Sequence, residues 1–242
     1  MYAIKIEGLT KRYGDLVAVD GLTLDIGEGE LFSLLGVNGA GKTTTIKMLS
    51  CLTKADGGDA YVLGESVSKN PTAVKANIGV SPQETAVAGG LSVRENLELI
   101  AGIYGFSKEK TREKISLLSD MLGLSAVMEK RAGKLSGGYA RRLSIAMALI
   151  SEPKVIFLDE PTLGLDVIAR AELWDIIRSL SGKVTVILTT HYMEEAEALS
   201  DRIGIMKDGR LLVCDTPDAI KEKTGEPSIE RAFIKIVRGE EK

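Results

Sequence analysis

Short apolar segments that end in glycine or in a polar cluster recur along the chain and predict the strands of a buried sheet. The clearest are residues 31–35, 154–158 and 184–189, in which apolar side chains follow one another with little alternation. Continuous runs of this kind are typical of parallel strands, which are covered on both faces. A shorter candidate, residues 77–80, leads into Ser81-Pro82-Gln83.

Before this core, the pattern changes to short β-type segments separated by turn residues. Glycine-containing breaks at residues 14–15 and 27–29 divide the first 30 residues, so we expect a small antiparallel sheet there. Its candidate strands are residues 2–9, 17–19 and 22–26, with another at 59–64. Near the other end, residues 202–207 and 211–214 flank Asp208-Gly209, which is a strong hairpin signal.

Helical spacing dominates the middle of the chain. Ser92 and Glu95 form a capping box for a helix that ends near Tyr104, and Ser107 begins a second helix that Gly123 ends. We therefore expect residues from about 84 to 152 to form a helical insert. Further helices are expected at residues 43–51, 140–150 and 166–180, and in the charged tail from residue 216 to residue 242.

These elements together predict an α/β fold. Its core is a mainly parallel sheet of the P-loop NTPase type, with an N-terminal antiparallel β subdomain and an inserted α-helical subdomain. The 242 residues, 44% of them hydrophobic, suffice for one sizeable core, and a single domain covering residues 1–242 is the default expectation.

The glycine-rich loop between the first buried strand and the first helix carries the clearest chemistry. Residues 36–44 satisfy G-x-x-x-x-G-K-[ST], in which backbone N–H groups and a helix N-terminus surround phosphates. Lys42 supplies a mobile charge, and the Thr43 hydroxyl can ligate Mg²⁺. An ordinary glycine-rich turn is the alternative, but a chance match in such a chain has odds on the order of one or two per cent. The expected nucleotide-binding residues of this loop are Gly36, Asn38, Gly39, Ala40, Gly41, Lys42, Thr43 and Thr44.

Two adjacent acids, Asp159 and Glu160, end the strand at residues 154–158. Ligands bind at the carboxyl ends of strands in open α/β sheets, so one acid can hold Mg²⁺ while the other orients or activates water. His191, the single histidine, follows the next buried strand and is expected at the same sheet edge. A lone histidine is more often structural, but here it can donate a hydrogen bond to a phosphate.

A second glycine pair, Gly137-Gly138, follows Ser136 at the start of a helix. This could be a simple helix cap with flexible glycines. Because the phosphates already have a binding loop at residues 36–44, we interpret it instead as a second nucleotide-binding face.

Composition narrows the possible partners. A net charge of -3 gives no reason to expect nucleic acid, and the two cysteines, Cys51 and Cys214, form no closely spaced metal or redox motif. No targeting pattern or membrane-length apolar run is present, so a cytoplasmic protein is expected.

The ordered motifs resemble those of ABC-type ATPases over essentially the whole chain. They are the phosphate loop, Gln83 after a strand, Leu135-Ser136-Gly137-Gly138, the strand ending in Asp159-Glu160, Asp166 and His191. The resemblance implies ATP as substrate with Mg²⁺. It also implies that Tyr13 stacks on adenine, although a half-exposed loop tyrosine without a ligand is the likelier interpretation from position alone.

The same resemblance implies a division of roles within the site. Thr43 and Gln83 would contribute to the Mg²⁺ shell with Asp159 behind them, and Lys42 would contact phosphate. Glu160 would be the general base and His191 a sensor of the γ-phosphate. Asp166 would lie at a dimer junction, where Ser136, Gly137 and Gly138 bind the nucleotide of the partner subunit. The active unit would then be a homodimer, or a heterodimer with a related cassette.

Two positions depart from the family pattern, because Tyr139 stands where Gln is usual and Val37 where Pro is usual. Neither change removes a phosphate-binding amide, but the side-chain contact from position 139 is in doubt. Residues 91–97, 101–105 and 227–233 are similar to the ATPase subunits of ABC-2-type exporters. We therefore expect attachment to the inner face of the cell membrane through a separate permease subunit, with a soluble ATPase acting on nucleic acid or the ribosome as the alternative.

The segment of residues 84–91 has two open interpretations. It is small, apolar and glycine-containing, so it could form the docking surface for the permease, or it could pack on the helical insert itself.

Overall fold

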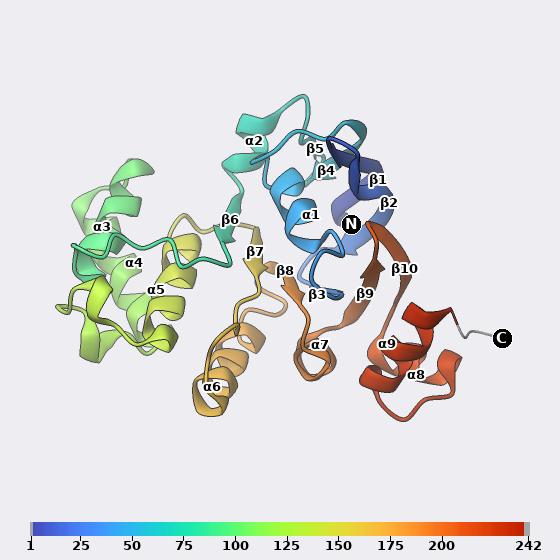
Figure 1. Cartoon of the computed structure of the whole chain (residues 1–242). Helices are drawn as coiled ribbons and strands as arrows, with labels where there is room; N and C mark the ends of the chain where they lie inside the picture. The colour runs from blue at the N-terminus through green and yellow to red at the C-terminus, as the bar shows by residue number, and fades with distance from the viewer. Residues whose placement is uncertain (1, 240–242) are drawn as a thin grey trace.

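A six-stranded sheet runs through the middle of the protein (Figure 1). The computed structural model describes residues 2–239. The strand order is β10-β9-β3-β8-β7-β6, and all neighbours are parallel except the β9–β10 hairpin. The strands are β3 (Leu31–Leu35), β6 (Ile78–Ser81), β7 (Val155–Asp159), β8 (Thr185–Thr190), β9 (Arg202–Lys207) and β10 (Arg210–Asp215).

A second sheet is antiparallel and has the order β2-β1-β4-β5. Its strands are β1 (Tyr2–Tyr13), β2 (Leu16–Gly27), β4 (Gly57–Val62) and β5 (Glu65–Ser66). The expected antiparallel subdomain is therefore present, but its first two strands are longer than predicted.

The sequence analysis predicted two strands in place of β2 because Gly21 interrupts the apolar pattern. In the structure Gly21 has a left-handed conformation with φ 65°. In the structure the pairing of β1 with β2 shifts register on either side of this position, and the strand continues. The prediction that Tyr13 lies in a loop is also wrong. Tyr13 is the last residue of β1 and pairs with Leu16 across a two-residue turn. The polar residues before it lie on a strand end that is largely exposed, where hydrophobic alternation is not required.

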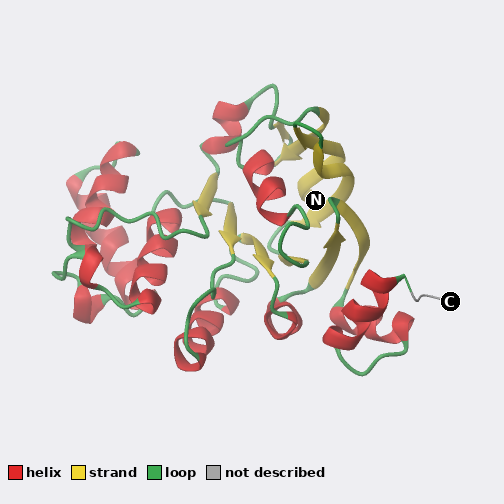
Figure 2. Ribbon diagram, viewed as in Figure 1, coloured by secondary structure: helices red, strands yellow, loops and turns green. Residues whose placement is uncertain are grey.

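Nine α-helices surround the two sheets within the described residues (Figure 2). They are α1 (Lys42–Leu49), α2 (Pro71–Lys75), α3 (Val93–Ile103), α4 (Lys108–Met121), α5 (Gly137–Leu149), α6 (Val167–Arg178), α7 (Met193–Leu199), α8 (Pro217–Thr224) and α9 (Ile229–Arg238). Helices α3, α4 and α5 gather on the β6 side of the sheet, whereas α8 and α9 lie beside β9 and β10 at the other edge (Figure 1). Across residues 2–239, the structure contains no helix with the length and apolarity to cross a bilayer.

Local signals place several of these helices. The predicted capping box is confirmed, because Glu95 N–H donates to Ser92 Oγ at 3.1 Å and Ser92 N–H donates to Glu95 Oε2 at 2.7 Å. Helix α5 begins three residues before the predicted start at Ala140, because Gly137 and Gly138 adopt helical geometry instead of forming a loop.

The core has two main layers, one on each face of the six-stranded sheet. Ile156 and Leu158 pack with the α3–α6 side, whereas Val155 and Phe157 pack with α1 and the antiparallel sheet. Every residue of β7 is buried, which explains why its sequence lacks polar alternation. This architecture confirms the predicted α/β fold class and fixes the carboxyl ends of β3, β7 and β8 at one sheet edge.

Candidate active site

The glycine-rich loop joins β3 to α1 at this edge, and its glycines are required by close backbone approach. A side chain at Gly36 would place Cβ 2.6 Å from the Met206 carbonyl oxygen, and one at Gly41 would place Cβ 2.4 Å from that of Ala18. Gly41 also has φ 103°, a conformation that L side chains rarely adopt. The loop therefore keeps its backbone N–H groups and the N-terminus of α1 accessible for an anion.

Lys42 lies in this loop with only 5% of its surface exposed. Its ammonium donates to the carbonyl oxygens of Gly36 at 2.7 Å and Val37 at 3.2 Å, and lies 3.7 Å from Glu160 Oε1. Burial lowers the pKa of Lys42, although the charges of Glu160 and Asp159 oppose this effect. The loop therefore holds a buried cation whose protein partners are mostly neutral carbonyls.

Asp159 ends β7 and accepts two hydroxyl hydrogen bonds at Oδ1. Thr43 Oγ1 donates at 3.0 Å and Thr189 Oγ1 donates at 2.5 Å. The sequence analysis assigned Thr43 and Asp159 to the same expected metal site but missed Thr189. The register of the parallel pair places Thr189 directly opposite Asp159, so a threonine at the end of the neighbouring strand was the available signal.

Glu160 follows β7 in a left-handed conformation with φ 47°. Its N–H donates to both the carbonyl oxygen of Thr189 at 3.1 Å and the Thr189 hydroxyl at 3.0 Å. This anchoring directs the carboxylate between Lys42 on one side and His191 on the other, since Glu160 Oε2 lies 3.2 Å from His191 Nδ1. The strand end thus places a buried carboxylate where it can reach an attacking water.

A cavity of about 450 Å³ unites most of the predicted residues. Tyr13 and Leu16 border it, with Tyr13 48% exposed and its ring 5.4 Å from Lys11 Nζ. The further lining residues are Ala18, Asn38, Gly39, Ala40, Gly41, Lys42, Thr43, Thr44, Gln83, Glu160, Leu163 and His191.

Gln83 reaches this cavity from the segment that follows β6. The segment is held by Arg141 of α5, which donates to the carbonyl oxygens of Pro82 at 2.7 Å and Gln83 at 2.6 Å. Arg141 is buried, which lowers its pKa, and the charge of Asp159 opposes this effect. The sequence analysis missed Arg141, because nothing near it in the sequence indicates that its guanidinium donates to the distant carbonyl oxygens of Pro82 and Gln83.

The second glycine pair does not line this cavity. Ser136 precedes α5 without a side-chain capping bond, and Gly137 and Gly138 form the first helical turn. A side chain at Gly138 would place its Cβ 3.3 Å from that of Ala169, so the pair lies beside the start of α6. There Asp166 caps α6, accepting from Ala169 N–H at 2.9 Å.

Tyr139 and the segment of residues 84–91 both face the helical region. The Tyr139 ring lies 5.6 Å from the Arg142 guanidinium, so Arg142 adjoins the residue that replaces the usual Gln. Val87 packs against the core of the helical region, and Asn96 Oδ1 accepts from Ala88 N–H at 2.8 Å. Packing on the helical insert therefore accounts for Val87, whereas Ala88 remains exposed.

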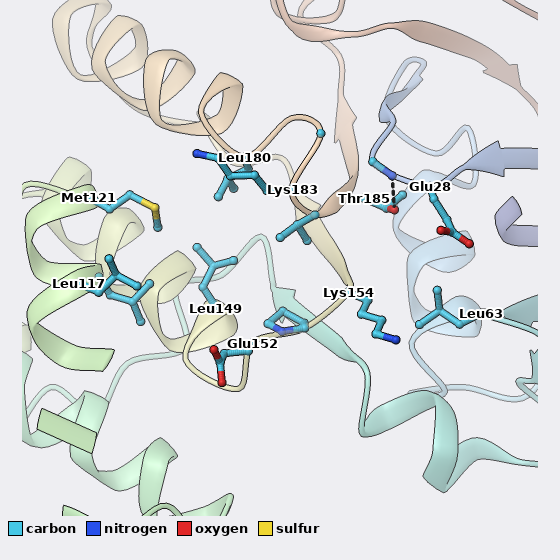
Figure 3. A pocket seen from close by; sticks show the side chains of 15 residues that line it. Glu28, Leu63, Leu117, Met121, Leu149, Glu152, Lys154, Leu180, Lys183 and Thr185 are labelled. Atoms are coloured by element: carbon cyan, nitrogen blue, oxygen red, sulfur yellow. Dashed lines mark hydrogen bonds between the residues drawn. The ribbon is translucent and has the colours of Figure 1, made fainter. Parts of the chain in front are cut away.

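A larger cavity, of about 710 Å³, lies at the opposite ends of the strands (Figure 3). Leu117 and Met121 of α4 face Leu149 and Leu180 across it, at the junction of the helical region with the sheet. None of the predicted site residues lines this cavity. The chemistry is therefore concentrated in the smaller cavity.

The donor set suits Mg²⁺ held through oxygen atoms. Thr43 and Asp159 place a hydroxyl and a carboxylate together beside the glycine loop, and Gln83 adds an amide to the same cavity. In residues 2–239 no group of three or more His, Cys, Asp or Glu side chains is arranged to hold a metal.

Comparisons with known proteins agree with this geometry. The family model described as ABC transporter matches residues 19–163, and a model described as AAA domain, putative AbiEii toxin, Type IV TA system matches residues 131–196. Daunorubicin resistance ATP-binding protein DrrA2 of Streptomyces coeruleorubidus is 43% identical over 230 residues, which is 95% of this chain and 71% of that protein. The probable multidrug ABC transporter ATP-binding protein YbhF of Escherichia coli is 39% identical over 97% of this chain, which corresponds to 41% of that longer protein.

Solved structures show the same relationship. An ATP-binding subunit of an ABC transporter has a TM-score of 0.86 and 26% identity, covering 97% of this chain and 99% of that one. A dimeric ATP-binding cassette in a post-hydrolysis state with ADP and Pi has a TM-score of 0.79 and 27% identity, covering 88% and 98%. The glycine loop, the paired acids and the relatives lead to one conclusion: this chain belongs to the family of ABC transporter ATP-binding cassettes, which are P-loop ATPases.

Proposed function

We propose that this chain is the ATP-hydrolysing subunit of an ABC exporter and powers a separate membrane subunit through ATP-dependent closure of a dimer. The observation that carries the enzymatic part is the position of Glu160, which lies between Lys42 and His191 in the cavity and next to Asp159, the acceptor of the Thr43 hydroxyl. This arrangement provides a cation for phosphate, a general base for water and a donor for the released phosphate.

Each group has a role that its contacts support. Lys42 would exchange its two carbonyl partners for the outer phosphates, which are stronger acceptors for a buried cation. Thr43 and Gln83 would hold Mg²⁺ with Asp159 behind them, and the bound ion would neutralise phosphate charge. Glu160 would take the proton of the attacking water, and His191 would donate to the γ-phosphate.

Tyr13 would stack on the adenine ring. It lies at the mouth of the cavity with one half of its surface exposed, and the Lys11 ammonium lies near its ring. An aromatic face at the cavity edge favours a purine base without requiring specific hydrogen bonds.

The dimer proposal rests on the second glycine pair, which does not line the cavity of its own chain. Ser136, Gly137 and Gly138 present the N-terminus of α5 outside this chain's own cavity, which supports a role toward a nucleotide held by another subunit. Val167 and Ile168, which follow Asp166 at the start of α6, are 78% and 73% exposed. Such apolar exposure beside the Asp166 turn is consistent with a contact surface. The dimeric cassette among the solved relatives supports the same assembly.

The export direction and the membrane partner are inferred from the relatives. The two relatives described above are named for daunorubicin resistance and multidrug transport. A third, the Nod factor export ATP-binding protein I of Rhizobium, is 42% identical over 91% of this chain. Since the structure contains no membrane-spanning helix in residues 2–239, attachment to the inner face of the membrane would be a protein contact. The soluble alternative, an ATPase acting on nucleic acid or the ribosome, is not favoured by these relatives or by the net charge of -3.

Co-purification with any membrane protein that is encoded beside this gene tests the proposal. We expect the wild-type chain and the Glu160→Gln variant both to be recovered with it, and only the wild type to hydrolyse ATP. Failure of both proteins to bind any membrane protein would favour the soluble alternative, and equal turnover would remove Glu160 from its role.

A further inference from the structure

A buried polar cluster lies behind His191, outside the nucleotide cavity. At its centre is Glu195 of α7, which is fully buried. Glu195 Oε1 accepts from the Trp174 indole N–H at 3.1 Å. Burial raises the pKa of Glu195, while the hydroxyls of Thr190 and Thr162, the indole and the charge of Arg170 act in the opposite direction.

Three members of this cluster hold buried polar atoms without a hydrogen-bond partner: Glu195 Oε2, Thr162 Oγ1 and Arg170 Nε. Removing a carboxylate from water is costly unless it is well paired, and well-packed apolar residues often stabilise a core better. The cluster is therefore not expected to increase the stability of the fold, and its contacts with neighbouring residues point to another role.

The cluster reaches the active site through Tyr192. The Arg170 guanidinium lies over the Tyr192 ring at 4.9 Å, and that ring lies 4.2 Å from the ring of His191. The Tyr192 N–H donates to Thr190 Oγ1 at 2.9 Å, which fixes the turn after β8.

His191 depends on this packing for its orientation. Its Nδ1 is buried and has no hydrogen-bond partner, although Glu160 Oε2 lies 3.2 Å away. A histidine is usually oriented by a hydrogen bond to one of its ring nitrogens. No hydrogen bond fixes Nδ1 here, so the contacts that set the ring direction are the Tyr192 ring on one face and the nearby Glu160 carboxylate.

We propose that Arg170 acts as a positioning residue for His191, holding Tyr192 against the imidazole so that the imidazole faces Glu160. The guanidinium packs on the tyrosine ring, and the tyrosine ring packs on the imidazole. The inference rests on the proposed role of His191. The contact between α6 and the imidazole, however, can be tested by a measurement that does not depend on ATP hydrolysis.

The single histidine makes this measurement direct. In protein purified without a histidine tag, the proton–carbon NMR correlation spectrum contains one imidazole Cε1–H signal, that of His191. Arg170→Lys keeps the charge but loses the planar stacking face, and Arg170→Gln removes the charge as well. We expect both substitutions to move the His191 signal.

Arg178→Ala is the matched control. Arg178 also links α6 to α7, because its Nη2 donates to the Ala198 carbonyl oxygen at 3.2 Å, but it belongs to no contact with Tyr192 or His191. This variant should leave the signal in place. An unchanged signal in both cluster variants, or an equal movement in the control, would overturn the proposal.

Kinetics add a second readout. Both cluster variants should lower kcat by about tenfold or more while the KM for ATP stays within about twofold, since misplacing a catalytic group costs turnover rather than binding. In a His191→Ala background neither should lower kcat further, and fully additive losses would contradict the mechanism. A moved NMR signal with unchanged kcat would confirm the positioning and refute the proposed role of His191.

Discussion

Replacing Thr189 with valine tests how the adjacent acids Asp159 and Glu160 are held. The Thr189 hydroxyl donates to Asp159 and accepts from the Glu160 N–H, so one side chain fixes both residues. Valine has nearly the same volume, so no cavity is created and the loss reports on the hydroxyl.

The size of the effect follows from the partners that remain. The Glu160 N–H keeps the Thr189 carbonyl oxygen at 3.1 Å, and Asp159 keeps the Thr43 hydroxyl at 3.0 Å. What is lost is one hydrogen bond to a charged group, worth about 2 kcal/mol. In a protein of this size that corresponds to a fall of roughly 4–8 °C in Tm.

Urea unfolding and ATPase activity measured together are the assay. Thr189→Ser retains the hydroxyl and is the control, expected to stay near the wild type in kcat and to lose less stability than the valine variant. If valine and serine variants are equally stable and equally active, the hydroxyl does not hold the acids and the reasoning fails.

Three further outcomes are expected. Lys42→Ala should abolish tight ATP binding in calorimetry, because the phosphates lose a buried cation, and an unchanged Kd would refute the site. Glu160→Gln should retain binding, lose turnover by roughly 10² to 10⁴ and dimerise with ATP in light scattering, whereas adding Ser136→Arg should block the dimer; a monomer at saturating ATP would count against a homodimer. Folding raises the pKa of the Glu195 carboxyl above 4.5, so its stabilising contribution is complete below pH 4.5 and is lost as pH rises through the folded-state pKa. The unfolding free energy of the wild type relative to Glu195→Gln should therefore fall with pH in that range, and a constant difference would show that the carboxyl titrates normally.

Local signals were sufficient where a short segment determines its own geometry. The glycine loop, the Ser92–Glu95 capping box and the Asp208-Gly209 hairpin each depend on a few adjacent residues, and the structure confirms their conformations. The apolar run of β7 also predicted a fully buried strand, because burial on both faces removes any need for polar alternation.

The rest depends on contacts between distant segments. Thr189 and Arg141 matter only because strand register and helix packing bring them to Asp159 and to the Gln83 carbonyl oxygen. The cluster around Glu195 could not be predicted for the same reason, since Trp174 and Thr162 approach it only in the folded chain. Sequence patterns therefore located the loop and the acids, but not the residues that hold them in place.

At position 160, the left-handed backbone lowers the stability of the fold for any residue with a side chain, whereas the proposed catalytic role requires the carboxylate of Glu160. A side chain in this conformation costs roughly 1–2 kcal/mol, which glycine would avoid. Glu160→Gly should therefore melt at a higher temperature than Glu160→Ala, while neither hydrolyses ATP. Selection for thermal stability alone would thus favour glycine at position 160 and remove the carboxylate. The protein keeps a locally strained residue there, and the hydrogen bonds from Glu160 N–H to Thr189 are what hold it.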